Sequence, residues 1–213
     1  MNPYLDLHLL SDDKFLDFIK NHPIKNIIVN ILEKRNMQIK NLNILEFGSG
    51  HGDISLSIAY HVDNVIGIDI SPKMIEYSNK IKKRFHCLDS NMKKKNNVIF
   101  TTKLSNIYFP TEINVIIAVN SLHFVHVNKI EETIKLFLSK ISKDGLIIIK
   151  EPTKRSKFAK LKDDKEKEKK FRMLKETEKK LDEVLSKIND IIYKKISKNM
   201  NMNIYLIFYK RFL

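Results

Sequence analysis

A glycine-dense turn and a later aspartate carry the residue types best suited to ligand chemistry. The turn, residues 48–52, reads GSGHG, and Asp69 follows a second apolar run. Glycines let backbone amides approach a ligand where any Cβ would collide. The helix expected after the turn points free N–H groups toward the same place, and a carboxylate ending the next strand can accept both hydroxyls of a ribose. Together these features predict a nucleoside site.

Short apolar runs flank the turn and predict the elements that position it. Residues 44–47 (ILEF) and 65–68 (VIGI) have the pattern of buried strands. Between them, Ile54, Ile58 and Ala59 favour a helix. Two parallel strands need a crossover of this kind. The stretch is therefore predicted to be a strand, loop, helix and strand in succession.

The spacing of the turn distinguishes between nucleotide-binding families. A dinucleotide fingerprint needs G-x-G-x-x-G, whereas this turn reads Glu46-x-Gly48-x-Gly50-x-Gly52. The motif resembles the cofactor loop of class I S-adenosylmethionine-dependent methyltransferases, of the small-molecule, type 11-like kind. A turn that binds no ligand is the alternative. The resemblance implies S-adenosyl-L-methionine as cofactor, with these residues binding it: Glu46 (its ammonium, through water), Gly48, Ser49, Gly50 and Gly52 (its methionine part), Asp69 (its ribose) and Ile70 (its adenosine).

A second segment with chemical potential follows the predicted strand 113–119. Residues 120–126 read NSLHFVH, which resembles the S-L-H-x-V segment of many small-molecule methyltransferases. The resemblance implies that Asn120 and His123 face the methyl group or the acceptor, with Asn120 also at the cofactor. His123 is a candidate catalytic base because its unperturbed pKa lies near neutrality. Alternatively, His123 only packs against a neighbouring loop.

Two positions depart from the family pattern. Lys103 stands where an acidic residue is expected to bind the adenine amino group. Either Ser105 or Asn106 would then substitute for it, or backbone groups alone would bind the adenine. Asn114 stands where the fourth strand usually begins with aspartate. Both departures favour a further hypothesis, a non-catalytic cofactor-binding or scaffold protein of the same fold. The intact glycines and Asp69 argue against that hypothesis.

The resemblance implies an α/β, Rossmann-like methyltransferase sandwich with helices on both faces of a mainly parallel, seven-stranded sheet. Runs at 190–193 and 203–209 predict the C-terminal antiparallel hairpin. We expect a single domain, 1–213, and a turn at 143–145 before the fifth strand. The lysine-rich stretch 80–97 reads as a surface insertion. The domain's expected parts are a lid-like segment (1–23), a cofactor-binding core (24–152), a charged helical insertion (153–190) and the terminal hairpin (191–213).

Composition limits the partners and the location. Hydrophobic residues make up 43% of the chain and charged residues 30%, as in globular proteins, and no apolar run approaches the ~18 residues that span a membrane. Cys87 is the only cysteine, which excludes an internal disulfide and favours an intracellular, cytoplasmic location. No paired motif around His86, Cys87 and Asp89 completes a metal site.

The net charge of +14 leaves two interpretations open. One is attraction to RNA or another polyanion, and the other is a lysine-rich composition spread over solvated faces. We expect methyl transfer by in-line displacement to a small-molecule acceptor, with RNA-directed transfer as the alternative. No other catalytic constellation is needed, because positioning supplies most of the acceleration in such a reaction.

Overall fold

The computed structural model describes residues 7–103, 112–153, 164–198 and 202–209. Its residues fall into two compact units, Met1–Pro110 (unit 1) and Thr111–Leu213 (unit 2). Each unit is described by itself, and the expected single domain stays a prediction. The strand order is β3-β2-β1-β4-β5-β7-β6. This order, mainly parallel with antiparallel C-terminal strands, confirms the α/β fold class expected from the sequence.

Unit 1 contains three parallel strands that place the glycine turn at their carboxyl ends. Pairing registers Leu45 against Ile66 and Ile66 against Ile99. α3 forms the crossover between the first two strands, as predicted. Most residues of these strands are buried, which is expected where helices cover a parallel sheet. The elements are β1 (Asn43–Phe47), α3 (Asp53–Ile58), β2 (Asn64–Ile68) and β3 (Val98–Thr101).

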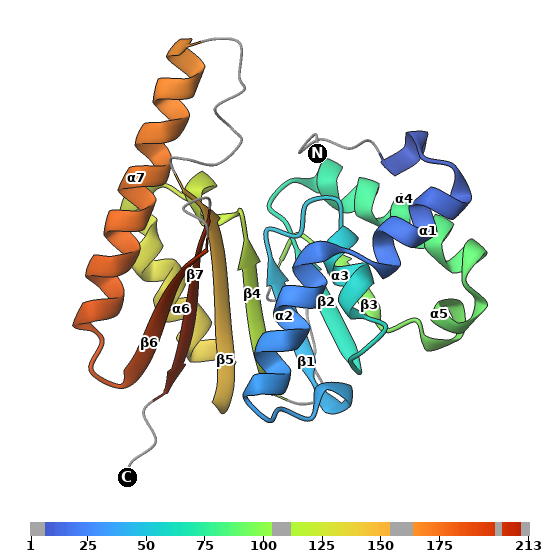
Figure 1. Ribbon diagram of the computed structural model, residues 1–213, viewed down its shortest axis with the longest axis horizontal. Helices are drawn as coiled ribbons and strands as arrows, with labels where there is room; N and C mark the ends of the chain where they lie inside the picture. Colours follow the sequence, from blue (N-terminus) through green and yellow to red (C-terminus); the bar gives the residue numbers. More distant parts are fainter. Residues whose placement is uncertain (1–6, 104–111, 154–163, 199–201, 210–213) are drawn as a thin grey trace. The chain divides into compact units, whose positions relative to one another are not determined.

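Helices surround these strands, and Figure 1 shows α1, α4 and α5 near one another within unit 1. The prediction that residues 80–97 form a surface insertion is wrong, because this stretch belongs to two helices that contribute to the core. Ile81 and Phe85, one helical turn apart, are fully buried and continue α4, and Asp89 then caps α5 through the amides of Asn91 and Met92. The helices are η1 (Leu7–Leu9), α1 (Asp12–Lys20), α2 (Pro23–Lys34), η2 (Ile39–Asn41), α4 (Pro72–Leu88) and α5 (Ser90–Lys95).

Unit 2 contains one parallel pair and the terminal hairpin. β4 (Ile113–Val119) pairs parallel with β5 (Ile141–Pro152). β7 (Met202–Tyr209) then runs antiparallel to β5 and to β6 (Ile191–Lys198). The hairpin predicted from the alternating C-terminal residues is therefore confirmed.

The start of β5 differs from the prediction. The expected turn at 143–145 lies inside the strand, because pairing begins at Ile113 with Ile141 and resumes at Val115 with Leu146. β5 thus advances five residues while β4 advances two, and the extra residues form a bulge. A Cβ on Gly145 would lie 2.4 Å from Ile141 Cγ1, so glycine permits this close approach.

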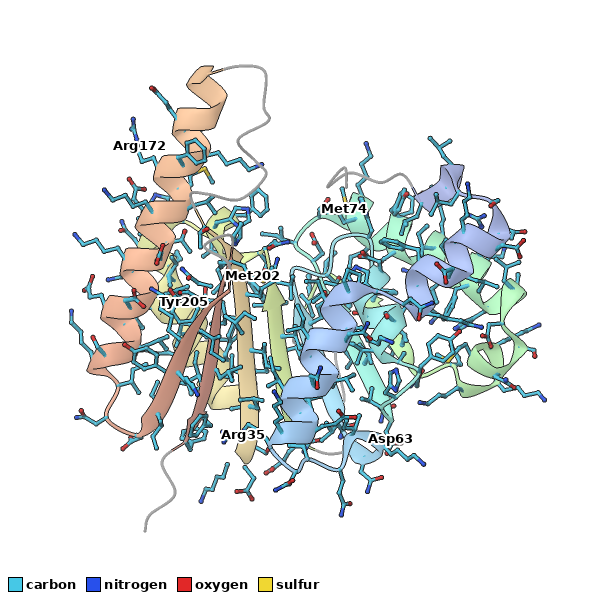
Figure 2. The ribbon with its side chains drawn as sticks, in the orientation of Figure 1. Arg35, Asp63, Met74, Arg172, Met202 and Tyr205 are labelled. Atoms are coloured by element: carbon cyan, nitrogen blue, oxygen red, sulfur yellow. The ribbon has the colours of Figure 1, made fainter. Side chains whose placement is uncertain are left out.

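Two helices of unit 2 lie side by side and contact β5 (Figure 1). They are α6 (Ile130–Lys140) and α7 (Asp164–Lys187). Lys195 of β6 ties α7 to the hairpin, since its Nζ lies 2.9 Å from Glu178 and 2.7 Å from Asp182. The same Nζ lies 5.3 Å from the ring centroid of Tyr205, which is fully buried and is labelled in Figure 2. Two short helical turns precede α6, η4 (Leu122–Phe124) and η5 (Val127–Lys129).

Candidate functional site

The glycine turn of unit 1 folds back on the end of β2. Three of its glycines have left-handed backbones, with φ of 70° at Gly48, 50° at Gly50 and 77° at Gly52, a region that other residues rarely adopt. The amides of Gly48 and Ser49 both donate to the carbonyl oxygen of Ile68, at 2.7 and 2.9 Å. The turn is thereby fixed beside the residue that precedes Asp69.

The glycines differ in what surrounds them. A Cβ on Gly52 would lie 2.4 Å from the Phe100 ring, and one on Gly67 of β2 would lie 2.6 Å from the same ring. Phe100 therefore occupies the space that these two glycines leave. A Cβ on Gly50 would meet no atom of the described chain within 4 Å. Gly50 is the point of the turn where another molecule can approach the backbone.

Asp69 joins the turn to the start of α4. Its Oδ2 accepts a hydrogen bond from the amide of Gly50, and its Oδ1 accepts one from the amide of Ser71, both at 2.9 Å. Ser71 in turn caps α4 by accepting from the amide of Met74. A carboxylate has about four acceptor positions, so these two bonds orient Asp69 and leave it capacity for further donors.

Glu46 of β1 is buried, with 2% of its surface exposed. Burial raises the pKa of its carboxyl group to about 8, although a hydrogen bond from the Ser55 hydroxyl opposes the shift. The negative charges of Asp53 and Asp69 raise the pKa further. Glu46 is therefore largely protonated near neutral pH. Ser55, which no sequence motif indicated, lies on α3 one helical turn beyond the glycine turn.

The N-terminal segment contacts two residues that adjoin the turn, Asp53 of α3 and Tyr77 of α4. His22 Nε2 lies 3.1 Å from Asp53 Oδ2, and its Nδ1 accepts from the amide of Ile24. The ring of Tyr77 lies 4.7 Å from that of His51 and 4.5 Å from that of His8. These contacts place residues of the expected lid-like segment beside the turn within unit 1.

In unit 2, Asn120 follows β4 in a left-handed conformation, with φ of 53°. Its amide donates to the carbonyl of Lys150 at 2.7 Å, and Lys150 Nζ donates to Asn120 Oδ1 at 2.8 Å. Burial lowers the pKa of the Lys150 ammonium group. Left-handed residues other than glycine are uncommon and concentrate at functional positions.

His123 is also held by β5. Its Nδ1 lies 2.6 Å from Glu151 Oε2, while Glu151 Oε1 accepts from the amides of Ser121 and Leu122 at 3.0 and 2.8 Å. His123 is 3% exposed, but the adjoining Phe124 is 70% exposed, with ring centroids 4.1 Å apart. The side chains of Lys150 and Glu151 thus fix the turn that begins at Asn120.

Comparisons with known proteins identify the family. A family model described as a methyltransferase domain matches residues 20–185. The chain belongs to this methyltransferase family. No curated protein matches it. The expected class I methyltransferase, and with it the enzyme class, is confirmed.

Solved structures with low identity have the same fold. A methyltransferase from Methanococcus maripaludis, described as putatively S-adenosyl-L-methionine-dependent, is 17% identical with a TM-score of 0.64 and covers 94% of this chain and 93% of that one. The plantazolicin methyltransferase BpumL, solved with a triazolic desmethylPZN analogue and SAH, is 14% identical with a TM-score of 0.63, covering 94% of this chain and 90% of that one. SAH-bound PaMTH1 from Podospora anserina is 15% identical with a TM-score of 0.62, covering 94% and 88%.

The structure of this methyltransferase groups the predicted residues by unit. Unit 1 brings Glu46, the glycine turn and Asp69 together, and Ile70 beside them is 93% exposed. Unit 2 brings Asn120 and His123 together on one turn. Sequence reasoning missed Lys150 and Glu151. Their signal was two charged residues directly after the apolar run 146–149.

The structure describes Lys103, which departs from the family pattern, but not the residues expected to substitute for it. Lys103 is exposed, and its backbone amide and carbonyl interact with the hydroxyl of Thr101. Ser105 and Asn106, the expected substitutes, lie outside the described residues. Within the described ranges, no cluster of three histidine, cysteine or acidic side chains could hold a metal ion, and no helix is long and apolar enough to cross a membrane.

Proposed function

We propose that this methyltransferase binds S-adenosylmethionine in unit 1, and that Asp69 and the glycine turn form the centre of the site. The observation that carries this proposal is the hydrogen bond from the Gly50 amide to Asp69. It fixes a carboxylate beside Gly50, where a Cβ would meet no atom of the described chain within 4 Å. Ribose hydroxyls are donors of the kind that Asp69 can still accept.

The residues present fit the cofactor in three further respects. Ser49 Oγ is buried and has no partner in the described part of the chain, so it can hydrogen-bond the methionine portion. Ile70 offers an exposed apolar surface directly after Asp69, which suits adenine. The negative charges of Asp53 and Asp69 near Glu46 favour an ammonium group, and such a group in turn favours ionisation of Glu46.

The chain's contribution to methyl transfer is mainly positional. When bound, the cofactor supplies a methyl group on a sulfonium, which carries its own leaving group. Holding the acceptor in line with that methyl group then supplies most of the acceleration. We assign to Asn120 the orientation of groups at the reaction centre, since Lys150 fixes its side chain. We assign to His123 the acceptance of a proton from the acceptor.

A small molecule is the acceptor class that we favour. The segment from Asn120 resembles that of small-molecule methyltransferases, and one solved structure of the same fold is a plantazolicin methyltransferase with a triazolic desmethylPZN analogue bound. RNA is the second candidate because the chain carries a net charge of +14. Lysines that bind phosphates release counterions, so RNA affinity would fall steeply with salt. Tight, sequence-selective RNA binding at physiological salt would reverse our preference.

Calorimetric titration with S-adenosylhomocysteine tests the cofactor assignment without any acceptor. We expect a dissociation constant in the micromolar range, about −8 kcal/mol, and no binding of NAD. Selective binding of NAD would refute the proposal. A cofactor complex that transfers no methyl group to any member of a broad acceptor panel would favour the non-catalytic hypothesis.

A further inference from the structure

Glu151 makes three hydrogen bonds that divide between its two carboxylate oxygens. Oε1 accepts from the backbone amides of Ser121 and Leu122, and Oε2 faces His123 Nδ1 at 2.6 Å. Glu151 is 5% exposed and His123 3%, so water competes little for these bonds. Glu151 therefore fixes the position of the His123 ring and is the hydrogen-bond partner of its Nδ1.

An ionised carboxylate only accepts hydrogen bonds. A hydrogen bond donated from Nδ1–H of His123 therefore satisfies a carboxylate at Oε2, and in a neutral ring this arrangement leaves the lone pair on Nε2. We propose that Glu151 is a positioning residue that holds His123 in this tautomer, so that Nε2 can take a proton from the acceptor. This inference rests on the proposed function, in which His123 accepts that proton.

The tautomer limits the chemistry of the acceptor. A proton acceptor is useful when the attacking atom carries a proton that it must lose, as a hydroxyl oxygen does. As the oxygen–methyl bond forms, the oxygen supplies its electron pair and the carbon–sulfur bond breaks toward sulfur. The hydroxyl proton moves to Nε2, and Glu151 stabilises the resulting imidazolium. The acceptor class that follows is a compound whose attacking atom carries a proton, of which a hydroxyl compound is the one tested below, rather than a thioether or tertiary amine.

A purely structural role for Glu151 would lead to different results. If Glu151 only anchors the turn, the length of its side chain matters for activity and its charge does not. Glu151→Gln keeps the length. Because the amides of Ser121 and Leu122 need an oxygen at the Oε1 position, the glutamine NH₂ group must face His123 Nδ1. That group donates, so the ring proton is forced onto Nε2. Glu151→Asp keeps the charge but shortens the reach.

Nitrogen-15 correlation spectra of the imidazole rings distinguish these roles. His123→Gln identifies the His123 signals among the seven histidines. We expect the Nδ1–H tautomer in the wild type and in Glu151→Asp, and the Nε2–H tautomer in Glu151→Gln. Glu132→Gln, at an exposed glutamate of α6 that pairs with Lys129, is the matched control and should leave the spectrum unchanged. An Nε2–H tautomer in the wild type, or an unchanged one in Glu151→Gln, overturns the proposal.

The same variants separate this inference from the proposed function. Titration with S-adenosylhomocysteine should give equal affinity for the wild type, Glu151→Gln and Glu132→Gln. With a panel of phenols and aliphatic alcohols as probes, Glu151→Gln should lower kcat at least tenfold. It should also remove the decrease of kcat at low pH, whereas Glu151→Asp should retain that decrease. Absence of cofactor binding in the wild type would refute the proposed function, whereas the imidazole spectra would still decide whether Glu151 sets the tautomer of His123. A normal pH profile in Glu151→Gln would refute the positioning role alone.

Discussion

The glycine turn of unit 1 and the turn after β4 in unit 2 both follow a parallel strand, but different parts of the chain hold them. In the first, backbone amides bond to the carbonyl of Ile68 and to Asp69, and left-handed glycines make the path possible. In the second, Asn120 adopts a left-handed conformation without being glycine, and the side chains of Lys150 and Glu151 hold the turn. Substitutions should therefore affect ligand affinity in the first region, and local stability or proton transfer in the second.

The largest expected effect is at Asp69. Asp69→Ala removes the acceptor of the Gly50 and Ser71 amides as well as the proposed partner of the ribose. Hydrogen bonds to charged groups contribute about 1.5–3 kcal/mol, so affinity for S-adenosylhomocysteine should fall about tenfold to a hundredfold. Circular dichroism should confirm that the variant is folded before calorimetry. Parental affinity in a folded Asp69→Ala protein would show that the ribose lies elsewhere.

Glu46 should make cofactor binding depend on pH. Its pKa of about 8 means that the free protein carries a neutral carboxyl group below that pH. A bound ammonium favours the carboxylate, so binding releases a proton and tightens as pH rises. Affinity for S-adenosylhomocysteine should rise about tenfold from pH 6.5 to 7.5, the limit for one proton, and level off above pH 8. Calorimetry in buffers of different ionisation enthalpy measures the proton directly.

Two variants make the Glu46 prediction sharper. Glu46→Gln should bind with little dependence on pH over this range. Ser55→Ala removes a hydrogen bond that lowers the pKa of Glu46, so it should move the pH response upward. Thr133→Ala on α6, in unit 2, is a control that should keep the wild-type response. Affinity of the wild type that is constant from pH 6 to 8 would contradict the prediction.

The contrast between the two turns explains what the sequence could reveal. Glycine spacing and short apolar runs are local signals, so the turn, Asp69 and the terminal hairpin were predictable. Lys150 and Glu151 act on residues about thirty positions away. Their charges after an apolar run mark the two positions, but no local pattern indicates which residues they contact. The bulge at the start of β5 was missed for a related reason. Gly145 resembles a turn residue, whereas pairing with β4 keeps its neighbours in the strand.

Substitutions at Asn120 test whether its left-handed backbone conformation costs stability. Asn120→Ala places a Cβ without a polar group in a left-handed conformation, which costs about 1–2 kcal/mol, and it removes the acceptor of the half-buried Lys150. Asn120→Gly removes the same acceptor without the backbone cost. The free energy of urea unfolding should therefore be lower for Asn120→Ala than for Asn120→Gly, by about 1 kcal/mol. Equal stability of the two variants would mean that the left-handed backbone carries no cost here.

The smallest expected effect is at Lys103, which lies just beyond β3. Its side chain is exposed, and the Lys103 backbone hydrogen-bonds the hydroxyl of Thr101. An ammonium group cannot accept from the adenine amino group, so Lys103→Ala should change affinity for S-adenosylhomocysteine less than about twofold, well within 1 kcal/mol. Lys103→Asp introduces an acceptor and should tighten binding, with Lys83→Asp on α4 as a control for the change in charge alone. A loss of binding in Lys103→Ala, beside retained binding in Asp69→Ala, would move the adenosine away from the carboxyl end of β2.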